Sequence, residues 1–209
     1  MNFKLTKDNI VEILPLSRMQ ESMLFQYLTK ENSAEYMEEL FVTLQGNLVK
    51  DNFIKACQVV IENNEVLRTV FSWKKTQNPI QIVLKKVELP IQFYDLDEKN
   101  GEVKRDEIVE EEHKKGIDLA EMPFRINVCK YSEHKSEIIF IYHHILFDGW
   151  STGVLLKEII EAYDAVTEER MPVFQRKTKY KEYLRYLKMH PFEKEKEYWS
   201  RTLKDYEIK

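Results

Sequence analysis

The sequence predicts an α/β fold, in which short buried strands alternate with amphipathic helices. Residues 40–44 and 138–141 are short runs of β-branched and aromatic side chains, which is typical of buried strands. Each run is followed by a segment whose apolar side chains recur at helical spacing, residues 53–61 and 154–166 respectively. A hydrophobic share of 43% in 209 residues is enough to fill the core of one domain, or of one lobe of a larger domain.

The first elements of the chain are a capped helix, a strand and a second helix. Ser17 and Gln20 are three residues apart, as the two members of a capping box are, so a helix is expected to begin at this point. The strand at residues 40–44 ends before a glycine and an asparagine that are typical of turns. The helix that follows is expected to have Asp51 or Asn52 as its N-cap.

The middle of the chain contains two strands and a charged helix. Residues 79–84 and 91–94 have the composition of strands. Residues 103–115 are densely charged and are followed by Gly116, which predicts a solvated helix with a glycine C-cap.

A hairpin and a strand-to-helix crossing come next. Residues 124–129 alternate between apolar and polar side chains, and the connector at 132–136 predicts a hairpin with the strand at 138–141. A helix is expected to begin near Ser151. Residues 142–151 therefore link a strand end to a helix start, which is where α/β proteins commonly carry their chemistry.

The overall composition excludes several functional classes. A net charge of −4 argues against a nucleic-acid partner held through phosphate contacts. No apolar run approaches the roughly 20 residues of a membrane span, and the five glycines form no phosphate-binding cluster. The two cysteines, Cys57 and Cys129, lie in apolar patterns, so we expect free thiols in a reducing compartment, the cytoplasm.

Four polar or small residues stand out within the crossing: His143, His144, Asp148 and Gly149. Neighbouring side chains on an extended segment point to opposite faces, so only one of the two histidines can face a given cavity. An isolated histidine on an apolar strand is more often a hydrogen-bonded core residue than a catalyst. A zinc site would need three convergent ligands, which the diverging histidines do not favour. Gly149 lies where a tight turn into a helix would require positive φ.

The pattern His143-His144-x-x-x-Asp148-Gly149 resembles the signature of the chloramphenicol-acetyltransferase-like acyltransferases, which include the condensation domains of nonribosomal peptide synthetases. Residues 15–25 resemble the first core motif of those condensation domains, and residues 65–71 resemble a second motif, Glu-x-Leu-Arg-Thr-x-Phe. Residues 180–186 resemble a later motif, with Tyr186 where tryptophan is usual. The resemblance covers essentially all of the chain, but only the first of the two lobes of such a domain.

This resemblance implies a single chloramphenicol-acetyltransferase-like lobe, which is half of a two-lobed condensation domain. Its fold would be a mixed β-sheet with helices packed on one side. Residues 1–172 would form the N-terminal lobe, and residues 173–209 would form a linker and helices leading toward the C-terminal lobe.

The resemblance also implies a role for each residue of the site. His144 would face the reaction channel as the catalytic residue, and His143 would be a scaffold residue. Asp148 would be paired with Arg68 and would hold the turn that presents His144, since a buried carboxylate left without a partner costs several kcal/mol. The backbone N–H of Gly149 is a candidate oxyanion donor. Whether His144 is a general base or a positioning and stabilising residue stays open.

The implied activity is amide bond formation between aminoacyl or peptidyl thioesters. The phosphopantetheine arms of two peptidyl carrier domains would bring the substrates, so no cofactor or metal would be bound directly. The expected partners are these carrier domains, the C-terminal lobe and adjacent synthetase domains, with neither nucleic acid nor membrane. One lobe alone is expected to be inactive, and the amino acids joined and the donor stereochemistry stay open.

Alternatives from other classes stay open as well. A coenzyme A-dependent acyltransferase would share the histidine signature, but would not explain residues 15–25. A carrier-docking lobe without turnover is the non-enzymatic alternative. An epimerisation domain usually has serine before tryptophan, whereas here Trp150 precedes Ser151, and a heterocyclisation domain would replace His143 by aspartate.

Overall fold

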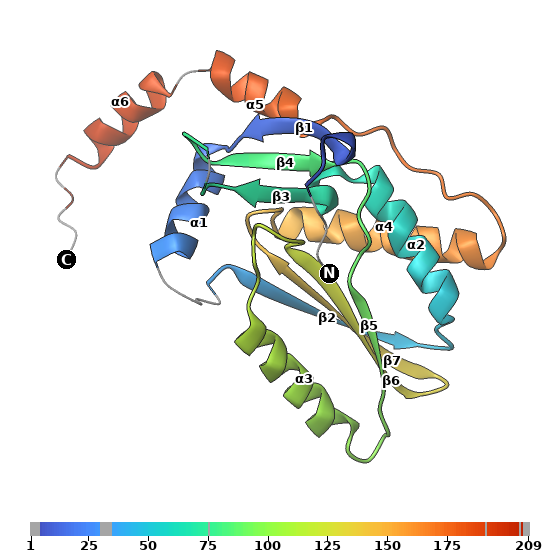
Figure 1. The fold of residues 1–209 in the computed structure, drawn as a ribbon. Helices are drawn as coiled ribbons and strands as arrows, with labels where there is room; N and C mark the ends of the chain where they lie inside the picture. The colour runs from blue at the N-terminus through green and yellow to red at the C-terminus, as the bar shows by residue number, and fades with distance from the viewer. Residues whose placement is uncertain (1–4, 30–34, 75, 191, 205, 207–209) are drawn as a thin grey trace. The chain divides into compact units, whose positions relative to one another are not determined.

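The computed structural model describes residues 5–29, 35–74, 76–190, 192–204 and 206, and the chain divides into two compact units, residues 1–176 and 177–209 (Figure 1). The α-helices and strands of the first unit are β1 (Ile10–Pro15), α1 (Arg18–Thr29), β2 (Met37–Gln45), α2 (Lys50–Asn63), β3 (Thr69–Ser72), β4 (Ile80–Leu84), β5 (Ile91–Asp95), α3 (Gly101–Lys115), β6 (Phe124–Ser132), β7 (Lys135–His143) and α4 (Gly149–Thr167). Short 3-10 helices span Lys7–Asn9 and Glu65–Arg68. The second unit contains α5 (Tyr180–Met189) and α6 (Glu193–Thr202).

The strands of the first unit form two sheets. A three-stranded antiparallel sheet has the order β1-β4-β3, and a four-stranded sheet has the order β2-β7-β6-β5. In the larger sheet β5 and β6 run parallel, whereas the other neighbours are antiparallel. The expected hairpin between β6 and β7 is confirmed, as are the α/β class and the mixed sheet.

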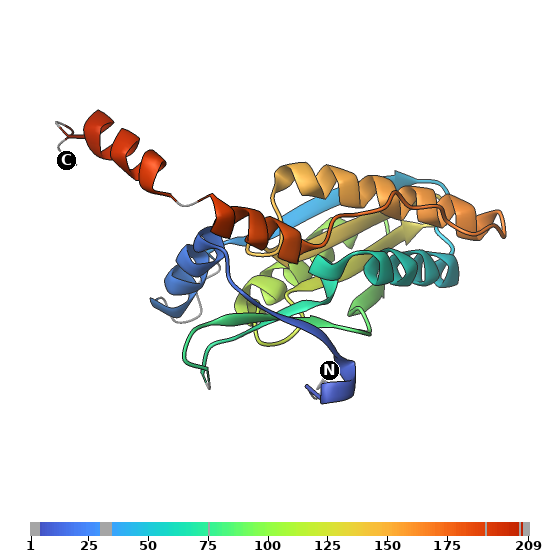
Figure 2. The same cartoon turned by 90° about the horizontal axis from the view of Figure 1, so that it is seen from above.

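Helices lie on both faces of the four-stranded sheet. Helices α2 and α4 run side by side over one face (Figures 1 and 2), where Phe53 of α2 packs edge-on against Phe93 of β5 at 6.5 Å between ring centroids. Helix α3 covers the opposite face, and its buried Glu112 contacts Arg125 of β6. The resemblance implied helices on one side of the sheet, and α3 adds a second helical layer on the other.

Most local expectations about helix ends are met, and one is wrong. Gly116 ends α3 with φ of 62°, as a glycine C-cap should, and Ser17 and Gln20 form a capping box. The N-cap of α2 is Val49, whose side chain cannot cap, so the choice of Asp51 or Asn52 was wrong. Helix α4 begins at Gly149, close to the expected start near Ser151. Among the described residues, no helix combines the length and hydrophobicity needed to cross a bilayer.

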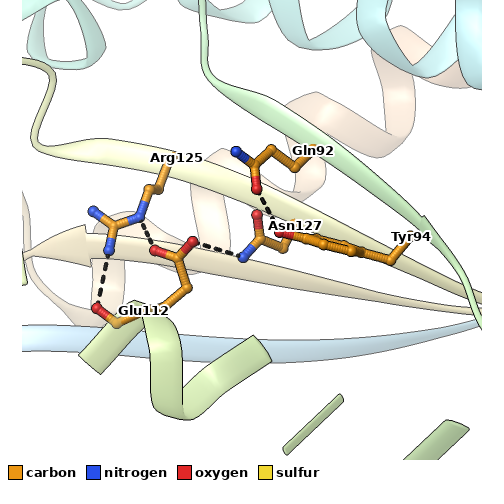
Figure 3. A network of polar contacts seen from close by, with 5 residues as sticks. All are labelled: Gln92, Tyr94, Glu112, Arg125 and Asn127. Carbon is orange, nitrogen blue, oxygen red and sulfur yellow. Dashed lines mark hydrogen bonds and ion pairs between the residues drawn. The ribbon is translucent and has the colours of Figure 1, made fainter. Parts of the chain in front are cut away.

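A buried polar network attaches α3 to the four-stranded sheet (Figure 3). The carboxylate of Glu112 accepts hydrogen bonds from the guanidinium of Arg125 and, at 3.3 Å, from the amide of Asn127. Glu112, Arg125 and Asn127 are 5%, 7% and 1% exposed as whole residues, so neither charge is solvated. The figure also shows Gln92 accepting a hydrogen bond from the hydroxyl of Tyr94 beside this network.

Removing one member of this ion pair should destabilise the unit strongly. Arg125→Met leaves the Glu112 carboxylate buried without its cation, which should lower the free energy of unfolding by about 3–5 kcal/mol. The double variant Arg125→Met, Glu112→Leu should regain most of that loss, because it buries no charge. Urea unfolding of the single and double variants measures both effects.

The matched control is the ion pair between Lys114 and Glu110 on the same helix, which lies in solvent. Lys114→Ala should leave the unfolding midpoint unchanged, because exposed ion pairs contribute little. Equal effects of Lys114→Ala and Arg125→Met would contradict the importance assigned to the buried pair.

Candidate functional site

The site is the end of β7, where the backbone is fixed from both sides. The N–H of His143 donates to the carbonyl of Pro123, just before β6, at 3.1 Å. The N–H of His144 donates to the carbonyl of Tyr36, just before β2, at 2.7 Å. The two consecutive histidines are therefore anchored to opposite neighbours in the sheet, and their backbone position does not depend on the loop that follows.

His143 is a core residue and is only 1% exposed. Its Nδ1 accepts a hydrogen bond from the N–H of Ile145 at 3.1 Å, and its ring contacts those of Tyr27 and Tyr36 at centroid distances of 5.9 and 6.0 Å. Burial, together with the neighbouring His144, lowers the pKa of His143 to about 4. His143 is therefore neutral at physiological pH.

His144 is partly open to solvent, and its side chain is 32% exposed. Among the described residues, the carboxylate of Glu38 on β2 comes within 4 Å of it, with Oε1 at 3.8 Å from Nδ1. One histidine of the pair is thus buried and the other is accessible, as the strand geometry predicted. The catalytic role assigned to His144 stays a prediction.

Asp148 is exposed and caps α4. Its carboxylate accepts hydrogen bonds from the backbone N–H of Ser151 at 2.9 Å and from the Ser151 hydroxyl at 2.8 Å. These two bonds are the main reason that the pKa of Asp148 lies below its ordinary value. Gly149 is the first residue of α4 and does not have the positive φ expected for it, which among the described glycines occurs at Gly46 and Gly116.

The expected ion pair between Arg68 and Asp148 is absent, and that prediction was wrong. Arg68 is buried, and its guanidinium donates to the backbone carbonyls of Ile61, at 3.1 Å, Glu62, at 3.3 Å, and Leu84. Burial lowers the pKa of Arg68 from its ordinary value. The arginine donates to two carbonyls at the C-terminal end of α2, where partners within the helix run out, and the carbonyl of Ile61 also accepts from the N–H of Asn64 at 3.2 Å. Asp148 needs no cation, because it is in solvent and bonded to Ser151.

Gln20 is a site residue whose long-range role the sequence did not reveal. It is 6% exposed, and beyond the capping box its amide donates to the carbonyl of Ile145, the residue after His144, at 3.3 Å. The side-chain amide of Gln81 on β4 donates to Oε1 of Gln20 at 3.0 Å and to the carbonyl of Pro15 at 2.8 Å. The sequence signals at this position were the capping box and the motif of residues 15–25, and neither predicts a contact so far away in the chain.

The residues from His143 to Gly149 lie apart from a large cavity of the first unit. This cavity, of about 1250 Å³, is lined by the loops around Lys86–Gln92 and Lys115–Met122 and includes none of the residues from His143 to Gly149. Among the described residues, no group of three His, Cys, Asp or Glu side chains is arranged to hold a metal ion. The chemical groups at the end of β7 are therefore the partly exposed imidazole of His144 and, close to it in the chain, the N-terminus of α4.

Comparison with known proteins identifies the family. The family model described as "Condensation domain" matches residues 10–208. A plipastatin synthase subunit from Bacillus subtilis (strain 168) is 33% identical over 95% of this chain, which covers 8% of that protein. Surfactin synthase subunit 3 of the same strain is 30% identical over 97% of this chain, covering 16% of that protein.

Solved structures show the same fold. The starter condensation domain of the rhizomide synthetase RzmA superposes with a TM-score of 0.82 at 15% identity, over 94% of this chain and 49% of that one. The first condensation domain of the calcium-dependent antibiotic synthetase, in complex with a substrate analogue, superposes with a TM-score of 0.84 at 14% identity, over 96% and 50%. The chain thus spans about half the length of these two structures and a small part of the curated relatives.

The buried histidine should make stability depend on pH. The pKa of His143 is about 4 in the folded chain, against 6.5 for a free histidine, so the unfolded chain binds a proton between these values that the folded chain does not. Stability is full above about pH 6.5 and should fall by about 3 kcal/mol as the pH drops to about 4. Urea unfolding at several pH values across this range gives the free energy of unfolding as a function of pH. That free energy should fall less steeply with decreasing pH for His143→Asn than for the parent. An equal pH dependence in both proteins would contradict the neutral buried histidine.

Arg68 and Asp148 should act independently on stability. Arg68→Ala removes a donor from three backbone carbonyls, of which that of Ile61 keeps the N–H of Asn64, and should cost about 2–4 kcal/mol, whereas Asp148→Ala removes one N-cap and should cost about 1 kcal/mol. Because the two side chains share no partner, a double-mutant cycle on urea unfolding should give a coupling below about 0.5 kcal/mol. A coupling energy several times larger would indicate that Arg68 and Asp148 interact directly, and would contradict the separation described above.

Proposed function

This chain belongs to the condensation-domain family, and on that premise we propose that it supplies one wall of a site where two carrier-bound thioesters are joined. The amine of the acceptor aminoacyl thioester attacks the carbonyl of the donor thioester, an amide bond forms, and the donor's thiol leaves. The phosphopantetheine arms of two peptidyl carrier domains bring both substrates, so the chain itself binds no cofactor. A thioester is already activated, and much of the catalysis therefore lies in bringing the two groups together.

His144 is the residue that we assign to the chemistry. The supporting observation is a partly exposed imidazole on a backbone held by hydrogen bonds to residues that flank two neighbouring strands. Its backbone is fixed in position, and its side chain still reaches solvent. It can take the proton of the attacking amine, or hold the amine by a hydrogen bond while the tetrahedral intermediate forms. His143 supports it from the core and takes no part in proton transfer.

The start of α4 is the second functional part of the site. The first N–H groups of a helix have no partner within it, and the helix dipole favours a negative charge there. Asp148 takes up the N–H of Ser151, and the N–H of Gly149 is our candidate donor to the oxyanion of the tetrahedral intermediate.

The partners follow from the same premise. We propose a second lobe, two carrier domains and adjacent synthetase domains, because the curated relatives are synthetase subunits many times longer than this chain. We place the reaction in the cytoplasm, consistent with Cys57 and Cys129 being buried free thiols whose pKa values burial raises to about 12 and about 11. A coenzyme A thioester as donor is the main alternative substrate.

The test is His144→Ala, assayed for dipeptide formation from two loaded carrier domains in the presence of the second lobe. We expect the rate to fall by about 10²–10⁴-fold, because the imidazole acts on the reacting amine. The matched control is His134→Ala, which removes an exposed histidine at the other end of the β6–β7 hairpin and should leave the rate unchanged.

Two further comparisons decide between the alternatives. The chain without a second lobe should give no product, since one wall cannot hold both thioesters in reacting geometry. Parent-level product from His144→Ala would refute the assignment of that residue. Binding of loaded carriers without any product, even with the second lobe present, would favour a docking lobe without turnover.

A further inference from the structure

The two ring nitrogens of His144 lie in different environments. Nδ1 is buried and has no hydrogen-bond partner among the described residues, whereas Nε2 is not a buried atom. The exposed third of the side chain therefore includes Nε2 and excludes Nδ1. A buried nitrogen without a partner is unfavourable, so a nearby acceptor or donor should satisfy Nδ1.

Glu38 provides the nearby acceptor. Among the described residues, it is the carboxylate that comes within 4 Å of His144, with Oε1 at 3.8 Å from Nδ1. Glu38 lies on β2 opposite Tyr142 of β7, so the two backbones are held in register by the sheet. Its side chain is 47% exposed, which leaves the carboxylate free to move the short distance to hydrogen-bond range.

Two other ionisable groups adjoin His144, and neither brings an acceptor to Nδ1. The carboxylate of Asp148, at the N-terminus of α4, accepts both bonds from Ser151 through Oδ1 and does not come within 4 Å of the ring nitrogens of His144. His143, on β7, is buried, with its Nδ1 bonded to the N–H of Ile145 and its pKa lowered to about 4, so it brings no charge. Among the described residues, Glu38 is thus the carboxylate within reach of Nδ1.

We propose that Glu38 is a positioning residue: its carboxylate accepts a hydrogen bond from Nδ1–H of His144 and so directs the lone pair of Nε2 outward. In neutral imidazole one nitrogen carries the proton and the other accepts, and the partner of the first decides which. With the proton on Nδ1, Nε2 is ready to accept a proton or a hydrogen bond from an amine. The catalytic use of this arrangement rests on the proposed function, whereas the tautomer itself does not.

The test measures the tautomer directly. The 209-residue chain, labelled with ¹⁵N in histidine, is observed by long-range ¹H–¹⁵N correlation spectra at a pH where the imidazole of His144 is neutral. We expect the parent to hold His144 with Nδ1 protonated in about tenfold excess, and Glu38→Ala to reduce that excess at least about fivefold. Glu38→Gln, which keeps an acceptor oxygen without the charge, should give an intermediate ratio and serves if the alanine variant does not fold.

The matched control is Glu39→Ala. Glu39 is the next residue of β2, and its side chain lies on the opposite face of the sheet, where it contacts His113 of α3 at 3.2 Å. This variant removes an equal charge and should leave the tautomer of His144 unchanged. A parent spectrum with the proton on Nε2, or a ratio that neither Glu38 variant alters, would overturn the proposal.

Activity separates this proposal from the proposed function. With the second lobe and loaded carriers present, Glu38→Ala should reduce the rate of dipeptide formation about tenfold through kcat, with KM for the carriers little changed. If the Glu38 variants change the tautomer ratio of His144 but the parent forms no product, the proposed function is wrong and the hydrogen bond between Glu38 and His144 is supported. If the parent forms product and the Glu38 variants leave the tautomer ratio of His144 unchanged, the proposed hydrogen bond is wrong and the proposed function is supported.

Discussion

The hydrogen bonds that hold β7 between β2 and β6 determine everything else at this site. A strand with neighbours on both sides has no freedom to slide, because a shift by one residue would turn its whole buried face toward the opposite side. His143 and His144 lie at the last positions where both neighbours still contribute, through the carbonyls of Pro123 and Tyr36. The alternation of one buried and one accessible imidazole is therefore a direct consequence of sheet register, and it needs no special contact made by either ring.

Polar side chains in the core extend this order beyond the sheet. Gln20 joins the start of α1 to the carbonyl of Ile145, so a helix from the beginning of the chain holds the loop that follows the histidines. On the opposite face of the larger sheet, the ion pair between Glu112 and Arg125 attaches α3 to β6. Each connection buries groups that would be costly if left unpaired, and so each selects one arrangement of the elements over slightly different packings.

The sequence predicted the elements well, since their signals are local. Gly116 at the end of α3 and the capping box of Ser17 and Gln20 depend on residues within a few positions of each other. The partners of Arg68 could not be found in this way. They are main-chain carbonyls of α2 and β4, which no side-chain pattern marks, and the choice of Asp148 assumed a buried carboxylate that lies in solvent. Glu38 was missed because the register of β2 against β7 brings it to His144.

The bonds of Arg68 have a consequence for how this family can be compared across sequences. Every acceptor of its guanidinium is a backbone oxygen, and a backbone oxygen is present whatever side chain occupies positions 61, 62 or 84. A change at those positions removes no acceptor, so it creates no pressure for a compensating change at the arginine. Contact inference from correlated substitutions would therefore not detect this interaction, although it joins three segments of the fold. In such a comparison the arginine would look uncoupled from positions 61, 62 and 84, although it bonds to the backbone of all three.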